Sequence, residues 1–155
     1  MVSRRFWSLG NRGFTAAELL TVVSILVVVV GASVPFLLSY WRAATLKASA
    51  EELAAALNRA RQVAIARNQS VCVEVLDGRY RYRVGGCTGT ISTGAGTDST
   101  GFFRLENHVT LTTNGNPVFS YLGAAAPGAT FTVTHPQGGA TLNVVVSASG
   151  RVQIQ

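Results

Sequence analysis

The sequence has few of the residues from which catalytic and metal sites are built. Its two histidines, His108 and His135, are isolated, and neither lies at metal-ligand spacing from other candidate ligands. The Gly-rich segment 86–101 has no lysine in the position that a phosphate-binding loop requires. No nucleophile is accompanied by a base, and no acid–base pair stands out. The sequence therefore predicts no enzyme, no cofactor and no metal site, and both histidines are expected at the surface or in turns.

Cysteine is scarce as well, because the chain has only Cys72 and Cys87. The two are not in a CxxC arrangement and no histidine is near them in sequence, which disfavours a catalytic pair. A structural disulfide is the preferred interpretation in an oxidising compartment. It would close a loop of about 15 residues and contribute roughly 3 kcal/mol.

Charged residues make up only 13% of the chain and hydrophobic residues 48%. The charged fraction is low for a soluble globular protein, but it is expected for a chain with one membrane helix. The formal net charge is +6. Three of the basic residues, Arg4, Arg5 and Arg12, precede Gly13, so the excess is weak evidence for a nucleic-acid partner.

An uncharged apolar run covers 19–38. About 20 such residues can cross the hydrocarbon core as a helix. The arginines before the run favour a cytoplasmic N-terminus, which places the C-terminal part in the periplasm or outside. A secretory signal cleaved near 31–33 is an alternative, but it leaves the carboxylate of Glu18 at the head of the run unexplained.

The helical pattern begins at a capping box formed by Thr15 and Glu18. It continues past Gly31 and Pro35, which membrane helices tolerate, and should end near Arg67 after about 54 residues, or about 80 Å. Beyond the apolar run the helix becomes amphipathic. Its apolar stripe consists of Leu46, Ala50, Leu53, Leu57, Ala60 and Ala64.

A β-hairpin is predicted over 71–84, with a two-residue turn at Asp77 and Gly78. A bond between the cysteines then requires the chain to fold back at Gly85 and Gly86. The pairs expected across the turn are Val71 with Val84, Val73 with Tyr82, Val75 with Tyr80 and, on the other face, Glu74 with Arg81.

After an exposed loop over 86–101, further strands are predicted at 102–105, 109–113, 118–122, 130–134, 141–147 and 151–154. The expected fold class is α+β: a long N-terminal helix, transmembrane and then amphipathic, whose outer half packs on an antiparallel β-sheet.

Arg79, Arg81 and Arg83 alternate along one face of the predicted hairpin. The preferred interpretation is a solvated outer face that Glu74 partly neutralises. The alternative is a basic patch that contacts DNA phosphates, joined by Arg104 and Arg151.

Residues 13–20 read GFTAAELL, which resembles the N-terminal motif of type IV pilins and type II secretion pseudopilins. In that family a prepilin peptidase cuts after the glycine and methylates the new N-terminus. The resemblance implies a cut between Gly13 and Phe14 and N-methylation of Phe14. Glu18 would become the fifth mature residue, and a neighbouring subunit's Phe14 amine could offset its charge and set the register of assembly. Simple helix capping by Glu18 is the alternative.

Residues 57–68, LNRARQVAIARN, and residues 149–152, SGRV, are similar to segments of the GspH/FimT group of minor pilins. Some members of this group contribute to DNA uptake, with basic residues near the C-terminus implicated. Arg151 is present here, whereas Gln153 stands where a second basic residue would strengthen that interpretation.

These observations predict a prepilin leader (1–13), a transmembrane helix half (14–40) and a periplasmic head (41–155). The resemblance implies a structural subunit of the bacterial inner membrane that primes or caps a type IV pilus, the slightly preferred context, or a type II secretion pseudopilus. Its partners would be other major and minor pilins or pseudopilins, the prepilin peptidase and the membrane. DNA binding during natural transformation is the alternative function.

Overall fold

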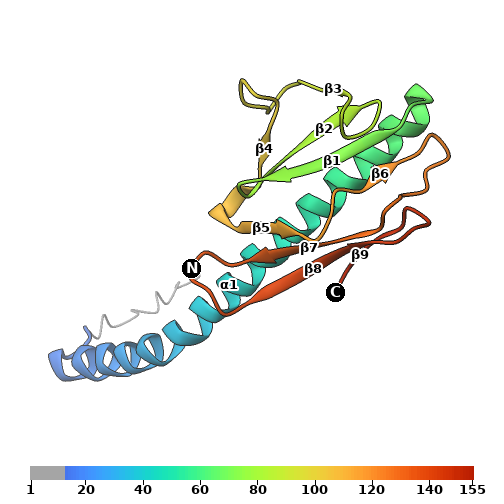
Figure 1. Cartoon of the computed structure of the whole chain (residues 1–155). Helices are drawn as coiled ribbons and strands as arrows, with labels where there is room; N and C mark the ends of the chain where they lie inside the picture. The colour runs from blue at the N-terminus through green and yellow to red at the C-terminus, as the bar shows by residue number, and fades with distance from the viewer. Residues whose placement is uncertain (1–12) are drawn as a thin grey trace, which may run out of the picture. The chain divides into compact units, whose positions relative to one another are not determined.

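The computed structural model describes residues 13–155 and contains one long helix, α1 (Ala16–Arg67), followed by antiparallel strands (Figure 1). The chain divides between Ser39 and Tyr40 into two compact units, each of which is described below by itself. The helix ends at the predicted residue and begins one residue after the predicted cap. Of the proposed leader, residues 1–12 lie outside the described part of the chain.

The first unit contains the apolar part of α1. Its most apolar 18-residue window has a mean hydropathy of 2.5 and no buried residue, so by length and composition this helix could cross a membrane. Pro35 lies inside the helix without ending it. At the helix start the predicted capping box is formed, because the Glu18 N–H donates to Thr15 Oγ1 (3.3 Å) and the Thr15 N–H to Glu18 Oε2 (3.4 Å).

The second unit contains the amphipathic end of α1, and every residue of the predicted stripe is buried there. Two small residues that the prediction omitted, Ser49 and Ala56, are buried beside the stripe. The helix stops as predicted at Asn68, which adopts a positive φ of 51°. Gln69 N–H donates to the carbonyl oxygen of Ala64 (3.1 Å) and so closes the last turn.

The first sheet is built around the hairpin of β1 (Val71–Leu76) and β2 (Arg79–Val84). All four predicted cross-strand pairs are present in this hairpin. The sheet has the order β3-β2-β1-β6, and β4 also pairs with β2. Its other members are β3 (Thr90–Ile91), β4 (Phe103–Arg104) and β6 (Val118–Phe119).

The second sheet has the order β5-β7-β8-β9. Its strands are β5 (Thr110–Thr113), β7 (Ala129–Thr134), β8 (Thr141–Val146) and β9 (Val152–Ile154). A short 3-10 helix, η1 (Glu106–His108), precedes β5. Both sheets contribute to one core with α1, including Val73, Phe119 and Phe131.

The α+β class is confirmed, and the structure corrects three details. The expected single sheet is two sheets, and strand β3 lies inside the segment predicted as loop. Two strands are much shorter than expected, because the segment at 102–105 pairs only over its two central residues and the segment at 118–122 only over its first two. Of the histidines, His108 is exposed in η1, and His135 is half-buried at the turn after β7.

Candidate functional site

The predicted processing site lies just before α1. Gly13 and Phe14 are both exposed and precede the first helical residue, Ala16. The Phe14 side chain is 73% exposed, and a Cβ added at Gly13 would meet nothing within 4 Å. The peptide bond between these residues is therefore accessible in the described chain, and its cleavage stays a prediction.

The Glu18 carboxylate is held at the N-terminal end of the helix. Besides the backbone bond of the capping box, its Oε2 accepts a hydrogen bond from the Thr15 hydroxyl (3.2 Å). An anionic group in the first turn interacts favourably with the helix dipole. Between Phe14 and Tyr40 no other residue is charged. The carboxylate thus contacts Thr15, which would be the second residue of a chain cut between Gly13 and Phe14.

Cys72 and Cys87 form a disulfide in the structure, with their Cα atoms 5.0 Å apart. The chain folds back between them at Gly85 and Gly86, which both have a φ of 92°. Gly85 N–H donates to the Ser70 carbonyl oxygen (2.8 Å) and so holds the reversal against the start of β1. The bridge fastens the end of the hairpin, which is a structural role.

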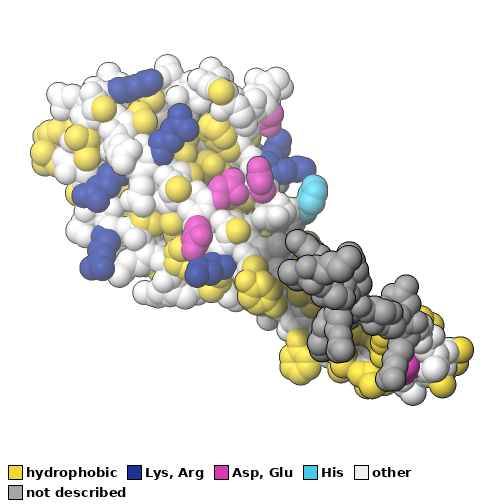
Figure 2. Space-filling model, turned by 180° about the vertical axis from the view of Figure 1, so that it is seen from behind, with side chains coloured by type: hydrophobic (Ala, Val, Ile, Leu, Met, Phe, Trp, Pro, Cys, Tyr) yellow, Lys and Arg dark blue, Asp and Glu magenta, His cyan; other side chains and the backbone are white. Residues whose placement is uncertain are grey.

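The predicted basic patch is not a single surface. Figure 2 shows the Lys and Arg side chains of one face scattered among apolar and uncharged ones. Arg79, Arg81 and Arg83 lie in a row on β2, whereas the exposed Arg151 flanks β9 in the other sheet (Figure 1). Arg104 is exposed on β4.

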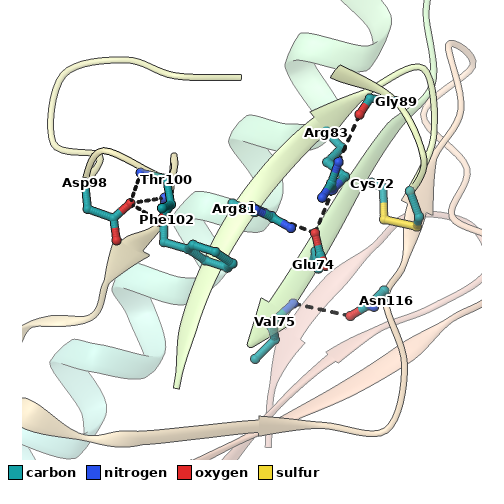
Figure 3. A network of polar contacts seen from close by, with 11 residues as sticks. Cys72, Glu74, Val75, Arg81, Arg83, Gly89, Asp98, Thr100, Phe102 and Asn116 are labelled. Carbon is teal, nitrogen blue, oxygen red and sulfur yellow. Dashed lines mark hydrogen bonds and ion pairs between the residues drawn. A yellow bond between two sulfur atoms is a disulfide. The ribbon is translucent and has the colours of Figure 1, made fainter. Parts of the chain in front are cut away.

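The row on β2 is neutralised from the neighbouring strand. The Nε atoms of Arg81 and Arg83 both donate to Oε2 of Glu74, at 2.7 Å each (Figure 3). The hydrogen bond from Arg81, supported by that from Arg83, lowers the pKa of Glu74 below its ordinary value of 4.5. Glu74 thus neutralises this row as expected, but the row is not the solvated face that was predicted, because only 12% of the Arg81 side chain and 20% of the Arg83 side chain are exposed.

The loop before β4 engages the same row from outside. Asp98 accepts a hydrogen bond from Arg79 (3.1 Å) and, through its other oxygen, from the Thr100 and Phe102 N–H groups, both at 2.9 Å. The Phe102 ring is buried, and the guanidinium carbon of Arg81 lies 4.4 Å from its centroid. These hydrogen bonds, with that from the Thr100 hydroxyl first among the causes, lower the pKa of Asp98.

Sequence reasoning did not single out Asp98 or Phe102. The available signal was the sequence DSTG at 98–101, since an aspartate followed by small polar residues and glycine often accepts hydrogen bonds from its own turn. That signal identifies a turn, but it does not reveal that the turn lies across β2.

The fold defines a class: a long, apolar N-terminal helix whose amphipathic end packs on antiparallel sheets is the architecture of pilin-like proteins. The model of the family described as "Type II transport protein GspH" matches residues 49–150. The chain belongs to this family.

A curated relative and two solved structures agree with this assignment. The "Pilin-like protein PilA1" of Thermus thermophilus is 35% identical over 158 residues, which cover 94% of this chain and 99% of that protein. The type IV minor pilin FimU of Pseudomonas aeruginosa has a TM-score of 0.53 at 21% identity, over 71% of this chain and 92% of that chain. The minor pseudopilin EpsH from the Type 2 Secretion System of Vibrio cholerae has a TM-score of 0.56 at 13% identity, over 71% and 95%. At these identities the two structures establish the fold alone.

Proposed function

We propose that the protein is a structural subunit that helps to prime or cap assembly of a type IV pilus or a type II secretion pseudopilus. Its family and its relatives support a minor pilin or pseudopilin rather than an enzyme. The prepilin peptidase cleaves between Gly13 and Phe14 and methylates Phe14. The helix then anchors the subunit in the bacterial inner membrane in a single pass, with the N-terminus cytoplasmic and residues 41–155 periplasmic. We favour the type IV pilus, because the relative that covers nearly the whole chain is a pilin-like protein.

One observation carries the assembly role: Glu18 is the sole charged residue between Phe14 and Tyr40, in the apolar part of a helix that could span a membrane. An unpaired carboxylate within the bilayer costs roughly 2.5–3.5 kcal/mol. The two hydrogen bonds from Thr15 compensate part of that cost in the single subunit. The Phe14 amine of a neighbouring subunit compensates more, because it is cationic, and this pairing sets the axial register of the subunits.

Glu18→Gln separates assembly from capping, because glutamine completes a capping box but carries no charge. We expect this variant to be processed and to be lost from sheared filaments, relative to its membrane pool, in a quantitative immunoblot. Thr15→Ala is the matched control: it weakens the cap by about 1 kcal/mol but keeps the carboxylate, so it should still be incorporated. If Glu18→Gln enters filaments as well as the wild type does, the pairing role is wrong.

The mature N-terminus provides a separate test of processing. Mass spectrometry of the membrane-bound protein should find a chain that starts at Phe14 with one added methyl group. A start after residue 31, 32 or 33 would instead support a cleaved secretory signal.

DNA binding during natural transformation is the second candidate function. Arg151 supports it, because this side chain is exposed and forms no ion pair within residues 13–155. The three arginines of β2 contribute little to it, since each already contacts a carboxylate. Filter binding across a salt series would test the idea, with Arg151→Gln expected to reduce the salt slope by about 1. Absence of binding at low salt would remove it.

A further inference from the structure

A hollow of about 160 Å³ opens between the last turns of α1 and the loop at 92–95. It lies within the second unit and is distinct from the arginine row on β2. Its apolar lining comes from Val63, Tyr82, Val84 and Phe103. Tyr82 is fixed in place, because its hydroxyl donates to the Ala56 carbonyl oxygen (3.0 Å). A cavity of about this size can hold a benzene ring, so the hollow has room for one apolar side chain.

Two arginines flank the apolar lining. Arg59, Val63 and Arg67 all line the hollow and follow one another at four-residue intervals on one face of α1. Eight residues of helix place the two arginine backbones about 12 Å apart. Both arginine side chains are exposed, and neither forms an ion pair or a side-chain hydrogen bond with another residue of the described chain.

We propose that this arginine-flanked hollow binds an extended acidic segment of another protein, in which two carboxylates four residues apart flank one apolar side chain. An extended strand rises about 3.3 Å per residue, so four residues span about 13 Å and match the separation of the arginines. Side chains at i, i+2 and i+4 share one face of such a strand. The central apolar side chain then enters the hollow beside Val63, and each carboxylate meets one arginine.

The required acidic pattern is absent from the chain itself, so a second copy is not the partner. No two acidic residues of the sequence are four positions apart. The acidic residues are Glu18, Glu51, Glu52, Glu74, Asp77, Asp98 and Glu106.

Nucleic acid fits the hollow poorly. Phosphate recognition uses several cations along a continuous track, whereas here two arginines are separated by an apolar lining. Tyr82 is buried and Phe103 half-buried, so neither offers the free ring face on which a base would stack.

Peptide binding to the full-length protein in detergent micelles tests the site directly. The probe is a fluorescent peptide with the core Asp-Thr-Leu-Thr-Asp, measured by fluorescence anisotropy at low salt. We expect saturable binding that weakens two- to fivefold in Arg59→Gln and in Arg67→Gln, and about tenfold in the double variant. Replacing both peptide aspartates by asparagine, or its leucine by alanine, should also weaken binding. Arg104→Gln is the matched control, because it removes an exposed arginine outside the hollow and should leave binding unchanged.

Failure of the acidic peptide to bind would overturn the proposal. Equal binding by the double variant, or by the asparagine peptide, would overturn it as well, because the arginines would then have no role.

A photoreactive amino acid at Thr93, an exposed residue of the hollow's rim, identifies the partner in cells. Mapping of the cross-linked peptide should find an acidic segment of a different protein. We expect the cross-linked partner to be another pilus or pseudopilus subunit, an expectation that rests on the proposed function. If the chain never enters a filament but still binds the acidic peptide, the proposed function fails and the site remains. Cross-links to a copy of this chain, to nucleic acid or to no macromolecule would overturn the identity of the occupant.

Discussion

Gly150 lies where the chain turns from β8 into β9, and the structure predicts that replacing it by alanine destabilises the protein strongly. Its φ is +77°, in the left-handed region, and an added Cβ would overlap the carbonyl oxygen of Gly123. The same Cβ would lie 3.3 Å from Nε of Arg61, so the guanidinium closes off a second side. Gly138 is the matched control, because its φ is +75° but an added Cβ would meet nothing within 4 Å.

Gly138→Ala and Gly150→Ala share the conformational cost of a positive φ, but only Gly150→Ala also has a steric cost. A left-handed conformation costs alanine roughly 1–2 kcal/mol at either position. Only at Gly150 must the backbone also move, because neither the new Cβ nor the Gly123 carbonyl can rotate away, and such overpacking costs about 1–3 kcal/mol more. For a head of this size, 1 kcal/mol corresponds to about 4 °C in Tm. We therefore expect Gly138→Ala to lower Tm by about 4–8 °C and Gly150→Ala by about 8–20 °C.

Thermal unfolding of the full-length protein in detergent measures this difference. Near-UV circular dichroism follows the packing of the buried Tyr80 and Tyr82 and, unlike a far-UV signal, does not report the helical backbone of the exposed apolar part. If the Tm decreases of the two variants agree to within about 2 °C, the close contact between the Gly150 and Gly123 backbones does not determine whether position 150 tolerates alanine. The conformational cost alone would then explain the need for glycine.

Three further predictions follow from contacts in the head. Replacing Cys72 and Cys87 by serine should lower the free energy of unfolding by about 3 kcal/mol, measured with denaturant, whereas a reducing agent should leave that variant unaffected. Because the pKa of Glu74 is lower in the folded state than its ordinary 4.5, its contribution is complete above pH 4.5 and is lost as the pH falls toward the folded pKa. Glu74→Gln should therefore reduce the loss of stability as the pH falls below the ordinary pKa of 4.5, and an unchanged pH dependence would argue against this ion pair. Tyr82→Phe should cost about 1 kcal/mol, since it removes the hydrogen bond that the hydroxyl donates to the Ala56 carbonyl oxygen, and a neutral result would place water there.

The helix and the hairpin were predictable because short-range patterns specify both. The stripe from Leu46 to Ala64 follows the helical period, and the turn at Asp77 and Gly78 sets the register of every pair in the hairpin. The division into two sheets depends on contacts between distant segments. Strand β3 has two residues and no alternation, so its pairing with β2 has no signature in sequence.

The candidate site was predictable to different degrees along the chain. The N-terminal motif combines a glycine, a carboxylate and an apolar run at fixed spacing, so it identifies particular residues. The pairing of Glu74 with Arg81 followed from the hairpin register, but its second bond to Arg83 depends on side-chain direction. The contact of Asp98 with Arg79 could not be predicted, because the loop that carries Asp98 has no periodicity.

Positive charge in this head therefore has to be judged by what surrounds each side chain, not by its spacing along a strand. The alternating arginines of β2 form the most regular basic pattern, yet Glu74 and Asp98 already contact them, and a new anionic ligand would have to displace those carboxylates. Arg59 and Arg67 form no such pattern in the sequence, because the residues between them are those of an ordinary amphipathic helix. They border an apolar hollow only because the loop at 92–95 lies across from their face of α1. An anion that binds to Arg59 and Arg67 displaces water, whereas one that binds to the arginines of β2 must displace a carboxylate. Anion binding at the helix therefore has the smaller free-energy cost.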